Sequence, residues 1–152
     1  MSYRRMLSAF IIAMSFLFAS ALPASADETG GNSDVGAFSA FQCIAAPGPG
    51  TWNDNCIDVQ GTGGYVSTVR SFLTGTVAPY FPADVCNVKI DVWGLTSLGE
   101  PWSDTYTNNS CGSGSLGAIF SPQRSFANNS YMCSRTTHSA GASAANCIII
   151  RL

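Results

Sequence analysis

The chain has 152 residues, of which 46% are hydrophobic and 11% are charged, and its formal net charge at pH 7 is −2. Apart from Arg4 and Arg5, its seven Lys and Arg residues are scattered, whereas binding to nucleic acid or to an anionic membrane requires clustered cations that neutralise phosphates. The composition therefore argues against a nucleic-acid partner, and the length suits a single domain with one core.

Residues 1–26 have the three-part pattern of a secretory signal peptide. The start MSYRR is positive, an apolar run covers 6–22, and the small residues ASA at 24–26 form a cleavage site. The apolar run is at the short end of the roughly 17–25 residues that span a bilayer. We therefore expect cleavage after Ala26 rather than a membrane anchor. The mature protein is expected to be secreted, soluble and free of the membrane, with a formal charge of 5 − 9 = −4.

Residues 27–42 are expected to be a flexible lead-in, because the segment DETGGNSDVG has almost nothing to bury. The six cysteines all lie in the remaining part, 43–152. An even number of cysteines in an exported chain indicates disulfides, since exported thiols meet an oxidising environment. Each neighbouring pair is symmetric about a glycine-bearing turn signal, as expected for two cysteines that face each other across a hairpin. We therefore expect the sequential pairs Cys43–Cys56, Cys86–Cys111 and Cys133–Cys147.

Alternating and β-branched segments predict strands along the mature chain. Residues 56–61 and 65–72 flank the turn signal GTGG and form a predicted strand pair. Residues 86–92 alternate strictly between apolar and polar, and the isoleucines in 147–151 predict a strand buried on both faces. No segment keeps apolar residues at helical spacing for three turns. The pattern predicts an all-β fold over 43–152, a small antiparallel β-sandwich that is immunoglobulin-like or similar.

Pairing Cys86 with Cys111 raises a register problem. A strict ladder puts the apolar residues of 86–92 opposite polar residues of 105–109, with Trp102 and Tyr106 on the other face. A one-residue bulge at 108–110 restores apolar residues opposite one another.

An alternative pairing joins Cys86 to Cys133. The segment Tyr131-Met132-Cys133 matches the Tyr-x-Cys of an immunoglobulin domain, in which such a bridge connects the two sheets near a tryptophan. We prefer the sequential pairing and keep this bridge as the competing solution.

Two kinds of segment match known motifs, but we expect neither a cofactor nor a modification at them. GSGSLG at 112–117 matches G-x-G-x-x-G, but a dinucleotide site also needs a βαβ unit around it. We interpret it as a loop, and no cofactor is expected. The segments NNS at 108–110 and 128–130 match the glycosylation sequon, which matters only in a eukaryotic secretory route, and we interpret them as turns.

His138 is the only histidine of the chain. A Ser-His-Asp triad would have to use it, and no G-x-S-x-G elbow presents a serine. Three disulfides leave no thiol for a nucleophile or a zinc site, so we expect no metal and an exposed loop histidine within a hairpin. Two carboxylate pairs, Asp54 with Asp58 and Asp91 with Asp104, could supply the acid and base of a glycosidase, although such surface carboxylates are more often solvated.

Several spaced motifs cover the mature chain: C-x-x-x-P-G in QCIAAPGPG, the segment CIDVQGTGGYV, an isolated cysteine before a V-x-I-x-V-x-G strand, and a last cysteine that starts the C-terminal strand. In these motifs the chain resembles small exported six-cysteine proteins of Streptomyces and related actinomycetes. The resemblance implies secretion and a β fold, and it carries over no catalytic residue. The chain departs from the pattern before Cys111, where Asn108 and Asn109 look inserted.

We expect a secreted, non-enzymatic and monomeric binding module whose extracellular ligand is a polysaccharide or a cell-surface component. The predicted site is Trp52, Asn53, Asp54 and Asn55, since an indole can stack on a sugar ring while amides and a carboxylate bind its hydroxyls. The competing interpretation is that Trp52 packs over the sheet edge as part of the core. The alternative function is a small secreted hydrolase or enzyme inhibitor, for which the chain offers only scattered carboxylates.

Overall fold

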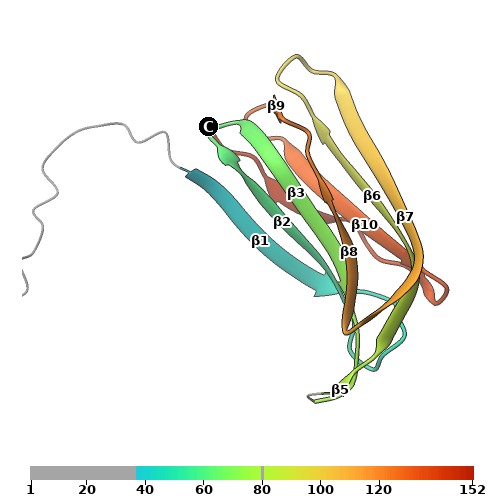
Figure 1. Ribbon diagram of the computed structural model, residues 1–152. Coiled ribbons are helices and arrows are strands. Elements are labelled where there is room, and N and C mark those ends of the chain that lie inside the picture. The colour runs from blue at the N-terminus through green and yellow to red at the C-terminus, as the bar shows by residue number, and fades with distance from the viewer. Residues whose placement is uncertain (1–36, 80) are drawn as a thin grey trace, which may run out of the picture. The chain divides into compact units, whose positions relative to one another are not determined.

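The computed structural model describes residues 37–79 and 81–152, and all regular elements in these ranges are β-strands (Figure 1). They form two five-stranded sheets and one two-stranded sheet, and every strand pairing is antiparallel. The predicted all-β class is therefore confirmed. Within these ranges no helix is present that could cross a membrane. The predicted signal peptide and residues 27–36 of the predicted lead-in lie outside the described residues.

The first large sheet, called sheet 1, has the strand order β1-β2-β3-β8, with β9 also pairing with β3 (Figure 1). Hairpin β2–β3 forms where the GTGG turn signal predicts it, and Gly63 in this turn has φ of 55°. The strands of sheet 1 are β1 (Ala37–Ala45), β2 (Asp54–Thr62), β3 (Tyr65–Thr74), β8 (Ser115–Phe120) and β9 (Arg124–Ser125).

The second large sheet, called sheet 2, has the order β11-β10-β6-β7, with β12 also pairing with β10. The short strands β4 and β5 pair with each other and extend from the body in Figure 1. The remaining strands are β4 (Thr76–Ala78), β5 (Phe81–Pro82), β6 (Asp84–Leu95), β7 (Pro101–Ser113), β10 (Tyr131–His138), β11 (Gly141–Ala142) and β12 (Asn146–Ile149).

Strand β1 corrects the predicted start of the domain. It begins at Ala37 and pairs along its whole length with β2, from Ala37 opposite Thr62 to Ala45 opposite Asp54. The predicted lead-in over 27–42 is therefore wrong for residues 37–42. Ala40 packs against the core and Phe41 stacks on Phe72 of β3, so this segment joins the sheet, which the composition of DETGGNSDVG did not indicate.

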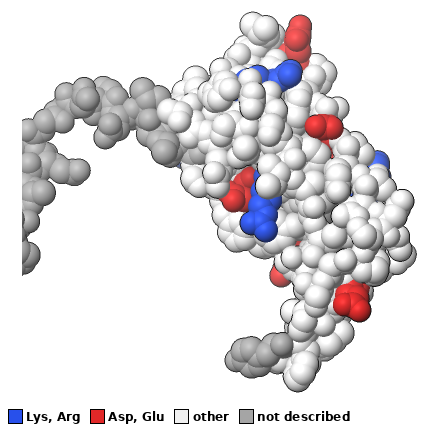
Figure 2. All heavy atoms as spheres, viewed as in Figure 1, with Lys and Arg blue, Asp and Glu red and all other residues white. Residues whose placement is uncertain are grey.

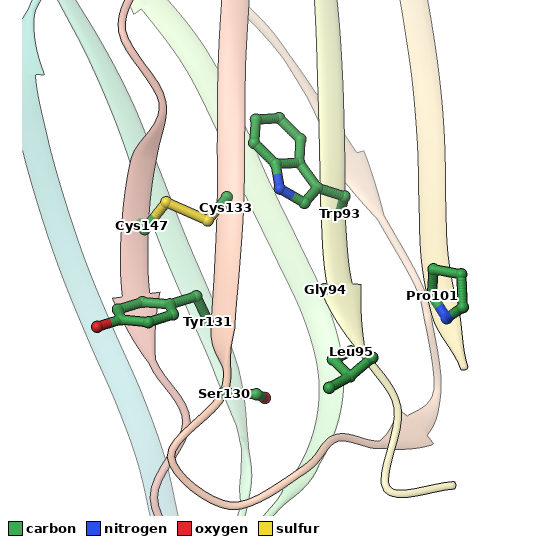
Figure 3. Close-up of a pocket in the computed structure, with 8 residues that line it drawn as sticks. All are labelled: Trp93, Gly94, Leu95, Pro101, Ser130, Tyr131, Cys133 and Cys147. Atoms are coloured by element: carbon green, nitrogen blue, oxygen red, sulfur yellow. A yellow bond between two sulfur atoms is a disulfide. The ribbon is translucent and has the colours of Figure 1, made fainter. Parts of the chain in front are cut away.

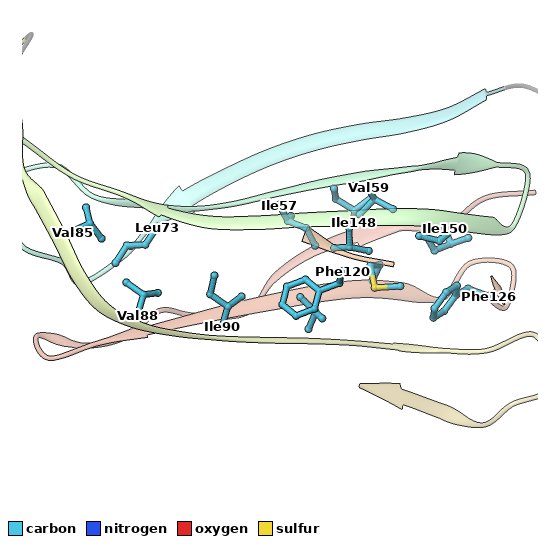
Figure 4. Packing of buried hydrophobic residues seen from close by; sticks show 14 residues of the cluster. Ile57, Val59, Leu73, Val85, Val88, Ile90, Phe120, Phe126, Ile148 and Ile150 are labelled. Carbon is cyan, nitrogen blue, oxygen red and sulfur yellow. The ribbon is translucent and has the colours of Figure 1, made fainter. Parts of the chain in front are cut away.

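One hydrophobic core fills the space between the two sheets (Figure 4). The alternation predicted over 86–92 is confirmed for 88–92, because Val88, Ile90 and Val92 are at most 1% exposed while the residues between them face outward. It breaks at Asn87, which has φ of 54°, so Cys86 does not share the buried face of Val88. Sheet 1 contributes Ile57, Val59, Val66, Val69, Leu73 and Phe120, and sheet 2 adds Met132 and Ile148. Apolar and polar residues thus alternate along these strands because one face of each sheet packs against the core.

The C-terminal isoleucines are only partly buried, which corrects the prediction of a strand buried on both faces. Ile148 and Ile150 are 6% and 0% exposed, but Ile149 is 36% exposed. Strand β12 lies at the edge of the arrangement and pairs only with β10. Its outward face therefore remains in contact with solvent.

The three disulfides follow the predicted sequential pairing: Cys43–Cys56, Cys86–Cys111 and Cys133–Cys147. Each one joins directly opposed residues of two neighbouring strands, with Cα–Cα distances of 4.0–4.1 Å. The competing bridge between Cys86 and Cys133 is wrong. Their strands β6 and β10 are neighbours in one sheet, so no cysteine pair connects the two sheets as in an immunoglobulin domain.

The predicted bulge in β7 is confirmed. Cys86 is opposite Cys111 while Val88 is opposite Asn108, so two steps along β6 correspond to three steps along β7. The shift places Trp102 on the inner side of sheet 2, where its ring meets the Phe126 ring edge-on at 5.8 Å between centroids. The inserted residue thereby brings an aromatic side chain against the core.

Candidate functional site

Trp52 is a solvent-exposed side chain in the structure. It is 54% exposed, so the interpretation of Trp52 as a core residue is wrong. Its backbone is fixed against β4, because the Trp52 N–H donates to the Thr76 carbonyl (3.1 Å) and the Thr76 N–H donates to the Trp52 carbonyl (2.9 Å). The indole therefore stands on an ordered loop.

The polar residues after Trp52 differ in how far the fold uses their side chains. The Asn53 amide closes its own loop, because its Oδ1 accepts from the Gly50 N–H (2.8 Å) and its Nδ2 donates to the Gly50 carbonyl (2.9 Å). Asp54 starts β2 and is half-buried, with its N–H donating to Thr74 Oγ1 (3.2 Å). The Asn53 amide is therefore used by its own loop, whereas only the backbone N–H and carbonyl of Asp54 are hydrogen-bonded and its carboxylate is not.

Asn55 is an internal structural residue, which corrects its prediction as a ligand contact. It is 0% exposed because it shares the inward phase of β2 with Ile57 and Val59. Its Nδ2 donates to the Ser134 carbonyl (3.2 Å) and to Ser143 Oγ (3.1 Å), and its Oδ1 accepts from Ser134 Oγ (3.4 Å). Of the four predicted residues, Trp52 and Asp54 thus keep side chains that the fold does not hydrogen-bond.

The carboxylate pairs are not arranged as acid and base. Asp91 is opposite Thr105, and Asp104 is opposite the inward-facing Val92, so their side chains lie on different faces of sheet 2. Asp54 and Asp58 share a face of β2, but four residues of strand separate their Cα atoms by about 13 Å. The two carboxylates of a glycosidase are about 5–9.5 Å apart, so neither pair fits that chemistry.

His138 ends β10 at the turn of the β10–β11 hairpin, as the hairpin interpretation predicts. The ring is half-buried rather than exposed, and its Nδ1 accepts a hydrogen bond from the Ala140 N–H (3.2 Å). This bond stabilises the turn and gives the imidazole a structural role.

A shallow groove lies on the outer face of sheet 2, where sequence analysis had placed no site. Its volume is about 580 Å³, and its lining is almost entirely apolar. Figure 3 shows the Trp93 and Tyr131 rings on either side of the Cys133–Cys147 disulfide. The lining residues are Trp93, Gly94, Leu95, Pro101, Ser130, Tyr131, Cys133 and Cys147.

Strand register brings the parts of this groove together. Trp93 of β6 is directly opposite Cys133 of β10, and Cys133 is opposite Cys147 of β12. Tyr131 lies two residues before Cys133 on the same face and is 56% exposed. The Cys133–Cys147 disulfide thus forms the rigid base of the groove, between the Trp93 and Tyr131 rings.

Polar groups lie beside the Trp93 end of the groove. The Arg135 guanidinium lies over the Trp93 ring at 5.7 Å from its centroid, and Asp91 is opposite Arg135 in the ladder. Asp91 also pairs with Lys89 (3.0 Å) and accepts a hydrogen bond from Thr105 Oγ1 (2.7 Å). Partial burial raises the pKa of Asp91, but the hydrogen bonds from Thr105 and Lys89 and the charges of Lys89 and Arg135 outweigh it and lower the pKa below its ordinary value.

A sequence signal for this groove was present. In the segment 86–93 the inward phase is occupied by valine and isoleucine, while Asn87, Lys89 and Asp91 face outward. Trp93 is on the same outward face as these polar residues, so an indole lies where a solvated side chain is expected. Its partner Tyr131 could not be found in the same way, because the register of β6 with β10 brings them together.

Comparison with protein-family models, with curated proteins and with solved structures yields no match.

Proposed function

We propose that the protein is an extracellular binding module that holds carbohydrate in the groove between Trp93 and Tyr131. The observation that carries the proposal is the pair of aromatic rings on either side of the Cys133–Cys147 disulfide on an open sheet face. Aromatic rings in soluble proteins are normally covered. Here Tyr131 is 56% exposed and Trp93 is half-buried beside the same groove, which favours a ligand with flat apolar surfaces.

Sugar rings match the mixed chemistry of this surface. An indole and a phenol offer apolar faces for stacking, and they lose little conformational entropy on binding. Asp91, Thr105 and Arg135 lie beside Trp93, and a sugar hydroxyl that binds them would exchange with the Asp91–Thr105 hydrogen bond or with the Arg135 contact to the Trp93 ring. The groove volume of about 580 Å³ falls within the range of about 300–1,000 Å³ for small-ligand sites.

Support for an extracellular location comes from the covalent structure. Three disulfides are formed, and no free cysteine is present among the described residues. Disulfides persist in oxidising compartments and are rare in the cytosol. The signal-peptide pattern over 1–26 supports the same location.

The proposal is tested by retention of the purified protein on a panel of insoluble polysaccharides. The wild-type protein should bind at least one of them, and Trp93→Ala and Tyr131→Ala should each weaken that binding by about tenfold or more. Trp52→Ala is the matched control, since Trp52 is also exposed but lies away from the groove. Equal binding by Trp93→Ala and wild type, or loss of binding in Trp52→Ala alone, would reject the groove as the site.

A further inference from the structure

The outer face of sheet 1 carries a row of four residues with a symmetric chemical order. Strand register places Phe41 opposite Asp58, Asp58 opposite Arg70, and Arg70 opposite Ile119. These residues come from β1, β2, β3 and β8, so the row crosses the sheet. Its order is apolar, acidic, basic, apolar.

The ends of the row are exposed apolar side chains. Phe41 is 64% exposed and Ile119 is 70% exposed. Phe41 is held in place by Phe72, since their rings stack with centroids 6.4 Å apart. Phe72 in turn packs closely over Gly117, because a Cβ atom at Gly117 would lie 2.3 Å from Phe72 Cβ. The apolar surface is therefore ordered before any partner binds.

The two central charges are not paired with each other. The Arg70 guanidinium extends over the Phe72 ring at 4.8 Å from its centroid, and Asp58 accepts only a long bond from Gln60 Nε2 (3.4 Å). Across residues 37–79 and 81–152, the one ion pair joins Lys89 and Asp91. Figure 2 shows that charged side chains are sparse on the face in view, most of which is uncharged. Both charges are available to a partner.

We infer that this face is the interface of a homodimer. A two-fold axis that runs parallel to the strands, midway between β2 and β3, places β2 over the partner's β3 and β1 over the partner's β8. Each Asp58 then faces a second copy of Arg70, and each Phe41 faces a second copy of Ile119. A two-fold interface needs a self-complementary surface, and the symmetric row supplies one.

The size of the face suits this partner. Strands β1, β2 and β3 have 9, 9 and 10 residues and β8 has 6, and at about 3.3 Å per residue and about 4.8 Å between strands they give a face of about 540 Å² in projection. Side-chain relief brings the accessible area toward the roughly 800 Å² per partner of a stable interface. The dimer replaces the expectation of a monomer. It does not depend on the proposed function, because the Trp93–Tyr131 groove lies on the other sheet and stays open in both copies.

Sedimentation velocity over a range of concentrations tests the dimer. The wild-type protein should sediment as a dimer, and Asp58→Arg or Arg70→Asp should each give a monomer, because each change places like charges opposite one another twice. An equimolar mixture of the two variants should form a heterodimer, since every facing pair is then complementary. Asp104→Arg and Arg151→Asp are the matched controls, being exposed and outside the row, and should remain dimers.

Circular dichroism establishes that each variant is folded, and Phe41→Ser combined with Ile119→Ser provides a second, uncharged disruption at exposed positions. This double variant should also be a monomer. A wild-type protein that stays monomeric at about 100 μM, a concentration well above the Kd of most stable complexes, would overturn the inference. So would a wild-type dimer that persists in both charge variants, or two monomeric charge variants that fail to associate when mixed.

Discussion

Asn55→Ala should lower the free energy of unfolding by about 3 kcal/mol. The Asn55 side chain makes three hydrogen bonds, two with Ser134 and one with Ser143, and all of the groups are buried. Each such bond contributes about 1 kcal/mol, and the partners left without a hydrogen bond add to the cost. For a domain of this size the change corresponds to a fall in Tm on the order of 10 °C.

The assay is urea unfolding at pH 7 without reductant, followed by far-UV circular dichroism. Asn53→Ala is the control, because Asn53 makes two bonds to Gly50 in a half-buried loop and should cost about 1 kcal/mol. A loss below about 1 kcal/mol in Asn55→Ala, or equal losses in both variants, would refute the structural role of Asn55. Loss of polysaccharide binding in Asn55→Ala with unchanged stability would restore it as a ligand contact.

Three further predictions concern the cysteines, the histidine and the acidic group beside the groove. Reduction under native conditions should lower Tm by tens of degrees, because bridges with sequence separations of 13, 25 and 14 contribute about 3 kcal/mol each to a total stability of about 5–15 kcal/mol. His138→Ala should change the free energy of unfolding by less than about 1 kcal/mol, and EDTA should leave Tm unchanged; a large fall with EDTA would indicate a metal site. The lowered pKa of Asp91 stabilises the fold above the unfolded pKa, and this contribution is lost as the pH falls below about 4. Asp91→Asn should therefore destabilise the protein at pH 7 and have little effect at pH 3, and an equal effect at both pH values would contradict the assignment.

Local patterns in the sequence were sufficient to predict the three disulfides and several of the strands. The alternation over 88–92 defines which side of β6 faces the core, because side chains on a strand alternate with a period of two. Turn signals midway between neighbouring cysteines predict the three hairpin disulfides, and the mismatch opposite Val88 predicts the bulge near Asn109. Each of these features depends on residues close together in the chain or on one hairpin register.

The prediction of the binding site was wrong where contacts between residues far apart in the sequence determine the structure. Asn55 follows a polar loop segment and looks like part of it, but its partners Ser134 and Ser143 are 79 and 88 residues away. The groove between Trp93 and Tyr131 likewise forms only when β6, β10 and β12 are in register. Trp93 itself could be identified by its place in the outward phase, but the residues facing it could not.

The most direct test of the central claim is the fluorescence of Trp93 during titration with a bound sugar. The chain has three tryptophans, so Trp52→Phe combined with Trp102→Phe leaves Trp93 as the sole emitter. With an oligosaccharide from a polysaccharide that retains the protein, we expect a saturable shift or quenching of this emission, because the sugar stacks on the Trp93 ring. Binding of that oligosaccharide with unchanged Trp93 emission would show that the sugar does not bind at Trp93.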